Sequence, residues 1–180
     1  MQTNKGFTLL ELLMVMVIVG ILASIGTASF KYVSTSNRIA SEINGLLGDM
    51  QFARSQAIKT GSPVTVCPTT NFTGCASSTT WSTGWIVFLD LDGNGAVGAN
   101  ETIIRSQQAF STDTLVSSPA TFKYITFNRE GYASLSGVTG FTSIVLNSSP
   151  VNVQWRRCLA VSSIGAMTVE KSGASTPTTC

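Results

Sequence analysis

The sequence predicts an α+β protein, in which a long N-terminal helix precedes a domain built mainly from antiparallel strands. The first observation is an apolar run over residues 7–30 that continues as an amphipathic helical pattern over residues 31–61. The second is the change after Pro63 to short apolar or alternating runs separated by Gly, Asn, Ser and Thr. A helix followed by strands in this order is typical of the α+β class. The length of 180 residues suits one globular domain with an appendage.

The apolar segment over residues 7–30 contains one ionisable side chain, Glu11. A helix of this length spans roughly the ~30 Å hydrocarbon core of a bilayer, so we predict a transmembrane or fibre-core helix. A cleaved secretory signal is the alternative, but Lys5 is the only basic residue before the run and stands directly before Gly6. A carboxylate inside such a segment is costly and indicates a function.

The amphipathic helix over residues 31–61 follows directly. Its apolar residues recur every three or four positions, which predicts a buried stripe packed on a sheet. Gly61 and Pro63 form the expected stop signal. The stripe consists of Ile39, Ile43, Leu46, Met50, Ala53 and Ala57.

The rest of the chain, residues 62–180, is predicted to form the β-rich globular domain. Its short runs and turn residues suit an antiparallel sheet with hairpins. The predicted strand runs are PVTVCP, GWIVFLD, ETIIRS, FKYITFN, YASLSG, FTSIVLN, NVQWRRCLAVSS and AMTVEK.

The composition argues against an enzyme. The chain has no histidine, which removes imidazole general bases, Ser/His and Cys/His nucleophile pairs and every histidine-containing zinc site. The formal net charge of +2 is also far from the strongly basic balance that marks a nucleic-acid binder. We therefore expect no catalytic residues.

A calcium-loop pattern lies between two predicted strands. Asp90, Asp92, Asn94 and the closing Glu101 occupy oxygen-ligand positions of the twelve-residue loop, and Gly95 stands at its sixth position. A calcium loop of this type is normally flanked by helices, whereas WIVFLD and ETIIRS are predicted to be strands. The alternative is a solvated hairpin loop that uses Asp-Gly and Asn-Gly as turn residues. We expect no cofactor other than this candidate calcium.

Four cysteines suit a domain that is moved out of the cytoplasm. They allow three pairings, of which we favour Cys67 with Cys75 and Cys158 with Cys180. The first pair would close the loop PTTNFTG, and the second would fix a tail that has almost nothing to bury. A zinc site is disfavoured because the chain has no Cys-x-x-Cys pair and no histidine.

The stretch KGFTLLEL, residues 5–12, resembles the processing signal of type IV pilins. This resemblance implies that a prepilin peptidase removes the leader, residues 1–6, by cutting between Gly6 and Phe7 and then methylates the new amino group of Phe7. It also makes Glu11 the fifth residue of the processed chain and gives it a role in assembly.

The stretch WSTGWIVFLDLDGNGAVGANETIIR, residues 81–105, resembles the conserved block of FimT/FimU minor pilins and GspH-type pseudopilins. The resemblance implies a low-copy subunit that helps to initiate a type IV pilus or forms its tip. A pseudopilin of type II secretion is the alternative. The implied partners are other major and minor pilins, the peptidase and the inner-membrane assembly platform. The implied location is the inner membrane, with one span and a periplasmic domain, and then an extracellular pilus or periplasmic pseudopilus.

Some FimT-type relatives are DNA receptors for natural transformation, and the resemblance places their basic residues near the C-terminal strands. Here Arg156, Arg157 and Lys171 are the candidate phosphate contacts. Where a DNA-binding relative would have arginines after the late glycine, this chain has Ala166 and Met167 after Gly165. DNA binding is therefore an alternative to a solvated sheet edge.

Overall fold

The computed structural model describes residues 6–173 and 180, and for residues 25–29 it describes the backbone alone. The chain divides into two compact units, Met1–Asn37 and Arg38–Cys180. Residues 1–5 of the predicted leader lie outside the described residues.

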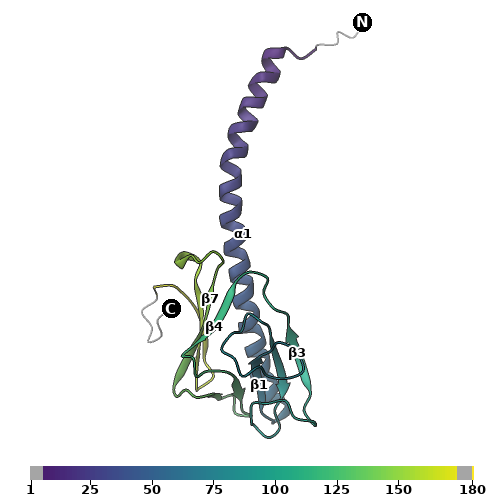
Figure 1. Ribbon diagram of the computed structural model, residues 1–180, viewed down its shortest axis with the longest axis vertical. Helices are drawn as coiled ribbons and strands as arrows, with labels where there is room; N and C mark the ends of the chain where they lie inside the picture. The colour runs from purple at the N-terminus through teal and green to yellow at the C-terminus, as the bar shows by residue number, and fades with distance from the viewer. Residues whose placement is uncertain (1–5, 174–179) are drawn as a thin grey trace. The chain divides into compact units, whose positions relative to one another are not determined.

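The first element is helix α1, Leu9–Thr60, which runs through the first unit and continues into the second (Figure 1). Its start is capped by Thr8, whose Oγ1 accepts a hydrogen bond from the backbone N–H of Glu11 at 3.3 Å. The described side chains before residue 25 are exposed. No helix among the described residues is long and apolar enough to cross a membrane. The predicted span, residues 7–30, lies partly outside those residues because the side chains of residues 25–29 are not described.

The part of α1 in the second unit buries the predicted apolar stripe. Its six side chains are at most 1% exposed, as the three- and four-residue spacing predicts. The helix ends at Thr60, and Gly61 continues with a positive φ of 68° while its N–H bonds to the carbonyl of Ala57.

Two antiparallel sheets make up the rest of the second unit. The five-stranded sheet has the order β3-β2-β1-β5-β6, and the four-stranded sheet has the order β4-β7-β8-β9. The strands of the first sheet are β1 (Val64–Pro68), β2 (Trp85–Leu89), β3 (Ile103–Gln107), β5 (Ile125–Phe127) and β6 (Ala133–Leu135). Those of the second are β4 (Thr114–Ser118), β7 (Phe141–Asn147), β8 (Arg157–Ser162) and β9 (Met167–Lys171).

The sequence analysis was wrong at two places in the second sheet. It missed β4, a short strand of sequence TLVSS whose side chains alternate between buried and exposed. It also predicted one strand over NVQWRRCLAVSS, whereas Val153–Trp155 form the 3-10 turn η1 and β8 begins at Arg157. Asn152 causes this difference, because its side chain caps the turn by accepting a hydrogen bond from the N–H of Gln154.

One hydrophobic core joins the helix to both sheets. It combines the apolar stripe of α1 with side chains of β1, β2 and β5 from one sheet and of β4, β7 and β8 from the other. Figure 1 shows the two sheets around this half of α1. The helix therefore supplies the shared layer on which both sheets pack.

Both disulfides have the pairing that the sequence analysis favours. Cys67 bonds to Cys75 and Cys158 to Cys180, with Cα–Cα distances of 5.6 and 5.7 Å. The first closes the loop after β1, and the second ties residue 180 to β8.

Candidate functional site

The predicted processing junction precedes helix α1. Gly6 and Phe7 are both exposed and stand outside the helix, and Phe7 is 82% exposed. A Cβ built on Gly6 would have no heavy atom within 4 Å. Packing among the residues that the structure describes therefore gives no reason for glycine at this position.

Glu11 lies in the first turn of α1 and is exposed. A negative charge there is favourable, because the first backbone N–H groups of a helix carry a partial positive charge. No ion pair within the described residues involves Glu11. Its carboxylate is therefore available to a charge outside the part of the chain that the structure describes.

Two of the three basic residues singled out for DNA, Arg156 and Arg157, are engaged in local hydrogen bonds. Arg156 follows η1 and donates from Nε to Oδ1 of Asn147 at 2.7 Å. Arg157 donates from Nη1 to the carbonyls of Gln154 and Arg156. Lys171 lies opposite Arg157 on β9 and is exposed. Arg157 is the first residue of β8, and Arg156 precedes the strand. The prediction that the two arginines are neighbours on one strand was therefore wrong.

The acidic loop follows β2, as predicted. One oxygen each of Asp90, Asp92 and Glu101 lies within 4.8 Å of the others. Burial raises the pKa of the Asp90 carboxyl, and the hydrogen bond from the Thr65 hydroxyl opposes this increase. This loop joins strands rather than helices, since β2 and β3 flank it.

Backbone N–H groups already bond to the carboxylates of this loop. Asp90 accepts from the N–H groups of Asn94 and Gly95, both at 3.0 Å. Glu101 accepts from the N–H groups of Leu91 and Gly98, both at 2.7 Å. These hydrogen bonds form a network within the loop that holds its shape. A solvated turn has the same pattern of hydrogen bonds.

We expect 1 mM calcium to leave the melting temperature of the purified protein unchanged. This concentration is roughly the dissociation constant of the weakest protein calcium sites. The reason is that both oxygens of Asp90 and of Glu101 already accept hydrogen bonds. Differential scanning fluorimetry with calcium and with EDTA checks this. A rise in melting temperature that disappears in Glu101→Gln would instead demonstrate a calcium site at this loop.

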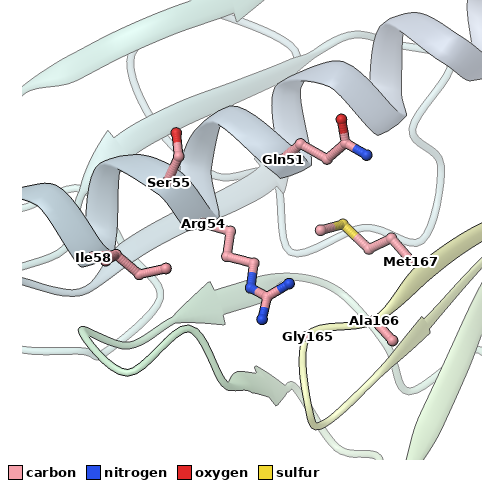
Figure 2. A pocket seen from close by; sticks show the side chains of 7 residues that line it. All are labelled: Gln51, Arg54, Ser55, Ile58, Gly165, Ala166 and Met167. Atoms are coloured by element: carbon pink, nitrogen blue, oxygen red, sulfur yellow. The ribbon is translucent and has the colours of Figure 1, made fainter.

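A groove that the sequence analysis did not predict lies between α1 and the turn joining β8 to β9 (Figure 2). Its volume is about 330 Å³. Figure 2 shows the guanidinium of Arg54 extending from the helix toward Gly165 and Ala166. The lining residues are Gln51, Arg54, Ser55, Ile58, Gly165, Ala166 and Met167.

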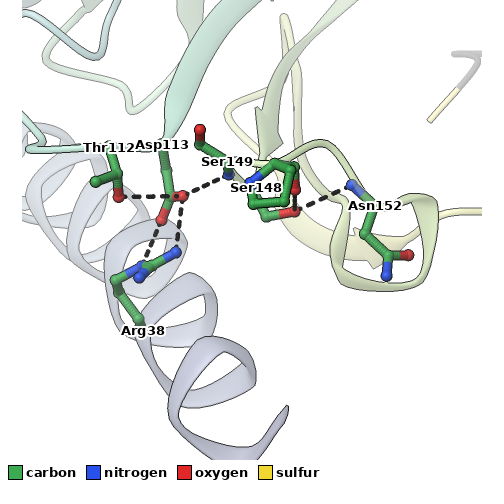
Figure 3. Close-up of polar contacts among 7 residues, drawn as sticks. Arg38, Thr112, Asp113, Ser148, Ser149 and Asn152 are labelled. Atoms are coloured by element: carbon green, nitrogen blue, oxygen red, sulfur yellow. Dashed lines mark hydrogen bonds and ion pairs between the residues drawn. The ribbon is translucent and has the colours of Figure 1, made fainter. Parts of the chain in front are cut away.

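An ion pair with a buried carboxylate was also missed (Figure 3). The side chain of Asp113 is fully buried before β4, and Arg38 of α1 donates two hydrogen bonds to it, at 2.7 and 2.9 Å. The N–H of Ser149, after β7, donates a third at 3.0 Å. This carboxylate therefore links the helix to the loops at one end of the second sheet.

Glu42 lies one helical turn after Arg38. Burial raises the pKa of its carboxyl to about 7, and the nearby Asp113 carboxylate adds to this increase, whereas the charge of Arg38 opposes it. Its Oε2 is buried without a hydrogen-bond partner among the described residues. The Arg38 guanidinium donates two hydrogen bonds to Asp113, and its charge also acts on Glu42. Two carboxyl groups therefore lie near a single cation.

A helix with an exposed apolar N-terminal part and a second half packed on antiparallel sheets is typical of the class of type IV pilin-like subunits. The chain matches the family described as type II transport protein GspH over residues 42–165, and the prokaryotic N-terminal methylation motif over residues 1–27. The chain therefore belongs to the GspH family of minor pilins and pseudopilins, whose members are structural subunits. The comparison with curated proteins finds no match.

Solved structures show the same fold. The chain is similar to the type IV minor pilin FimU of Pseudomonas aeruginosa in two crystal forms. For the first, the identity is 17% and the TM-score 0.60, with 80% of this chain and 96% of that chain covered. For the second, the identity is 16% and the TM-score 0.54, with 80% and 99% covered. These likenesses confirm the predicted α+β pilin fold.

Proposed function

We propose that the chain is a low-copy subunit of a type IV pilus that helps to initiate the fibre or forms its tip, and has no enzymatic activity. The observation that carries this proposal is the position of Glu11, an exposed carboxylate in the first turn of α1. It lies just after the Gly6–Phe7 junction and has no ion pair within the described residues.

The charge of Glu11 acts between subunits. Cleavage after Gly6 creates an ammonium group at Phe7, and in a fibre of staggered parallel helices the Glu11 carboxylate of one subunit lies beside the Phe7 ammonium of its neighbour. In a low-dielectric fibre core this pairing offsets part of the desolvation cost of both groups. One wrong axial register leaves both charges unpaired, so the pair selects the register.

The location and partners follow from this role. The precursor is anchored in the inner membrane by its N-terminal apolar segment, with the globular unit in the periplasm. A prepilin peptidase processes it, and the assembly platform adds it to a fibre with other major and minor pilins. The two disulfides fit an oxidising compartment.

The second candidate function is that of a pseudopilin in type II secretion, which the description of the matched family favours. The two functions differ in where the assembled subunit is found. A pilus subunit is recovered in fibres sheared from the cell surface, whereas a pseudopilin remains with the periplasmic pseudopilus.

We expect Glu11→Ala to reduce incorporation into fibres at least about tenfold. This corresponds to a loss of roughly 1.4 kcal/mol in the free energy of association between subunits. Insertion and folding of the globular unit should not change, because the Glu11 carboxylate forms no ion pair within the described residues. The measurement is immunoblotting of this subunit in sheared fibres, normalised to its amount in the cells.

Leu12→Ala is the matched control, since Leu12 is an exposed neighbour on α1 without a charge. Gly6→Val is a second test variant. It should block cleavage and leave an unassembled precursor of larger mass. Incorporation of Glu11→Ala at the wild-type level would show that Glu11 does not set the register between subunits.

A further inference from the structure

Arg54 is held rigidly at the wall of the groove. Its Nε donates to the carbonyl of Gly131 at 2.9 Å, and the guanidinium lies against two glycines. A Cβ on either Gly131 or Gly165 would come within 3.0 Å of Nε, and the Gly165 Cβ would also lie 2.2 Å from the Gly131 carbonyl. Both glycines have positive φ, 82° and 78°. The backbone thus closes on the Nε side of Arg54 and fixes the plane of its guanidinium.

The remaining N–H groups of Arg54 have no acceptor among the residues that the structure describes. The arginines that form ion pairs in the described residues are Arg38, Arg105 and Arg129, and the Gly131 carbonyl is the one acceptor found there for Arg54. The two terminal NH₂ groups are a planar pair of donors, which matches the two oxygens of a carboxylate. Arg54 is also the only charged residue that lines the groove.

The surroundings of Arg54 are mixed rather than uniformly polar. Ile58 in the lining is 52% exposed and Met167 in the lining is half-buried, while Ile164, which precedes Gly165 in the chain, is 63% exposed. Gln51 and Ser55 add an amide and a hydroxyl on the helix side. An anion with apolar neighbours fits such a groove better than a free, fully hydrated ion does.

The placement of other cations favours a carboxylate over a nucleic acid. Phosphate backbones are bound by several Lys or Arg residues along one surface. Arg157 and Lys171, which pair across β8 and β9, lie at the other end of these strands, about 13 Å from Met167 in the groove at ~3.3 Å per residue. A single fixed guanidinium therefore suits one carboxylate.

We propose that this groove binds an acidic segment of a partner protein, in which one Asp or Glu carboxylate pairs with Arg54 and its flanking apolar side chains contact Ile58 and Met167. The identification of the partner as a neighbouring pilin rests on the function proposed above. The binding of an acidic segment to the groove does not depend on that function, so it can be measured even if the protein assembles into no fibre.

The test uses the full-length processed protein in detergent micelles, labelled with ¹⁵N, and two peptides. Acetyl-Leu-Asp-Leu-amide carries the carboxylate, and acetyl-Leu-Asn-Leu-amide is its neutral match. We expect the Asp peptide to shift the Nε–H resonance of Arg54 and the amides of Ala166 and Met167. The Asn peptide should bind at least about tenfold more weakly, because it lacks the charge-assisted fork.

Two groove variants separate binding from folding. Ala166→Trp fills the groove while Arg54 stays in place, and it should abolish the shifts, whereas Ser163→Trp on the same turn, outside the groove lining, should keep them. Arg54→Lys keeps the charge but loses the fork, so it should weaken binding of the Asp peptide.

Three results would overturn the proposal. They are equal binding of the two peptides, binding that survives Ala166→Trp, and tighter binding of inorganic phosphate or a 12-mer DNA duplex at the same resonances. If instead the peptides behave as expected while Glu11→Ala enters fibres normally, the groove stands and the proposed register role fails.

Discussion

Arg38→Met should lower the free energy of unfolding by about 3–5 kcal/mol, the usual cost of leaving a buried carboxylate without its ion-pair partner. The expected loss is large because the side chain of Asp113 is fully buried, so its negative charge would remain in the protein interior with only the N–H of Ser149 and a long contact from Thr112. Methionine preserves the length of the aliphatic stem and thus much of its packing.

Replacing the other partner of the ion pair, Asp113, should lower the free energy of unfolding by less. Asp113→Asn keeps an acceptor for Arg38 and for Ser149, and the Arg38 side chain is 40% exposed, so water can solvate its charge. We expect a loss of about 1–3 kcal/mol. Urea unfolding of the two variants, followed by tryptophan fluorescence, measures both values, and equal losses would contradict the asymmetry.

Glu42→Gln should make the protein more stable at pH 8 by roughly 1–3 kcal/mol, and change little at pH 5. The pKa of the Glu42 carboxyl is about 7 in the folded chain against an ordinary value of 4.5. The folded state therefore binds the proton more tightly than the unfolded state. Wild-type stability falls as the pH rises from 4.5 to 7 and stays low above it, and glutamine removes this loss.

The charged groups that act on Glu42 are Asp113, which disfavours its ionised form, and Arg38, which favours it. Unfolding curves at pH 5, 6, 7 and 8 for the wild type and for Glu42→Gln measure the difference between them. Glu130→Gln is the control, because Glu130 is exposed and pairs with Arg129 on the surface. A wild-type stability that does not fall above pH 5 would contradict the prediction.

Local sequence signals predicted the elements that depend on periodicity. The stripe from Ile39 to Ala57 repeats with the helical period and is buried, and every strand except β4 overlaps a predicted run. These elements bury one continuous face, so their pattern is visible in a short window of sequence. The strand β4 has two serines and a threonine in five residues, and it is recognised only through its pairing with β7.

The Arg38–Asp113 pair and the groove at Arg54 could not be predicted in this way. Arg38 and Asp113 are 75 residues apart, and Arg54 and Gly131 are 77 residues apart. No periodic pattern links such positions, and their contacts exist only once both sheets have packed on the helix. Gly165 is a further example, because a Cβ at this position would clash with the Gly131 carbonyl, and this reason for glycine is visible only in the folded structure.

The core that joins α1 to both sheets has a consequence for the time course of synthesis. The apolar face from Ile39 to Ala57 is covered partly by Ile144, Leu159 and Val161, which are translated about 100 residues later. At about 5–20 residues per second, the helix therefore waits roughly 5–20 s with this face exposed. During that interval the nascent chain is a client for chaperones, and substitutions that slow completion of β7 and β8 should lower the yield of folded protein even where they leave its final stability unchanged.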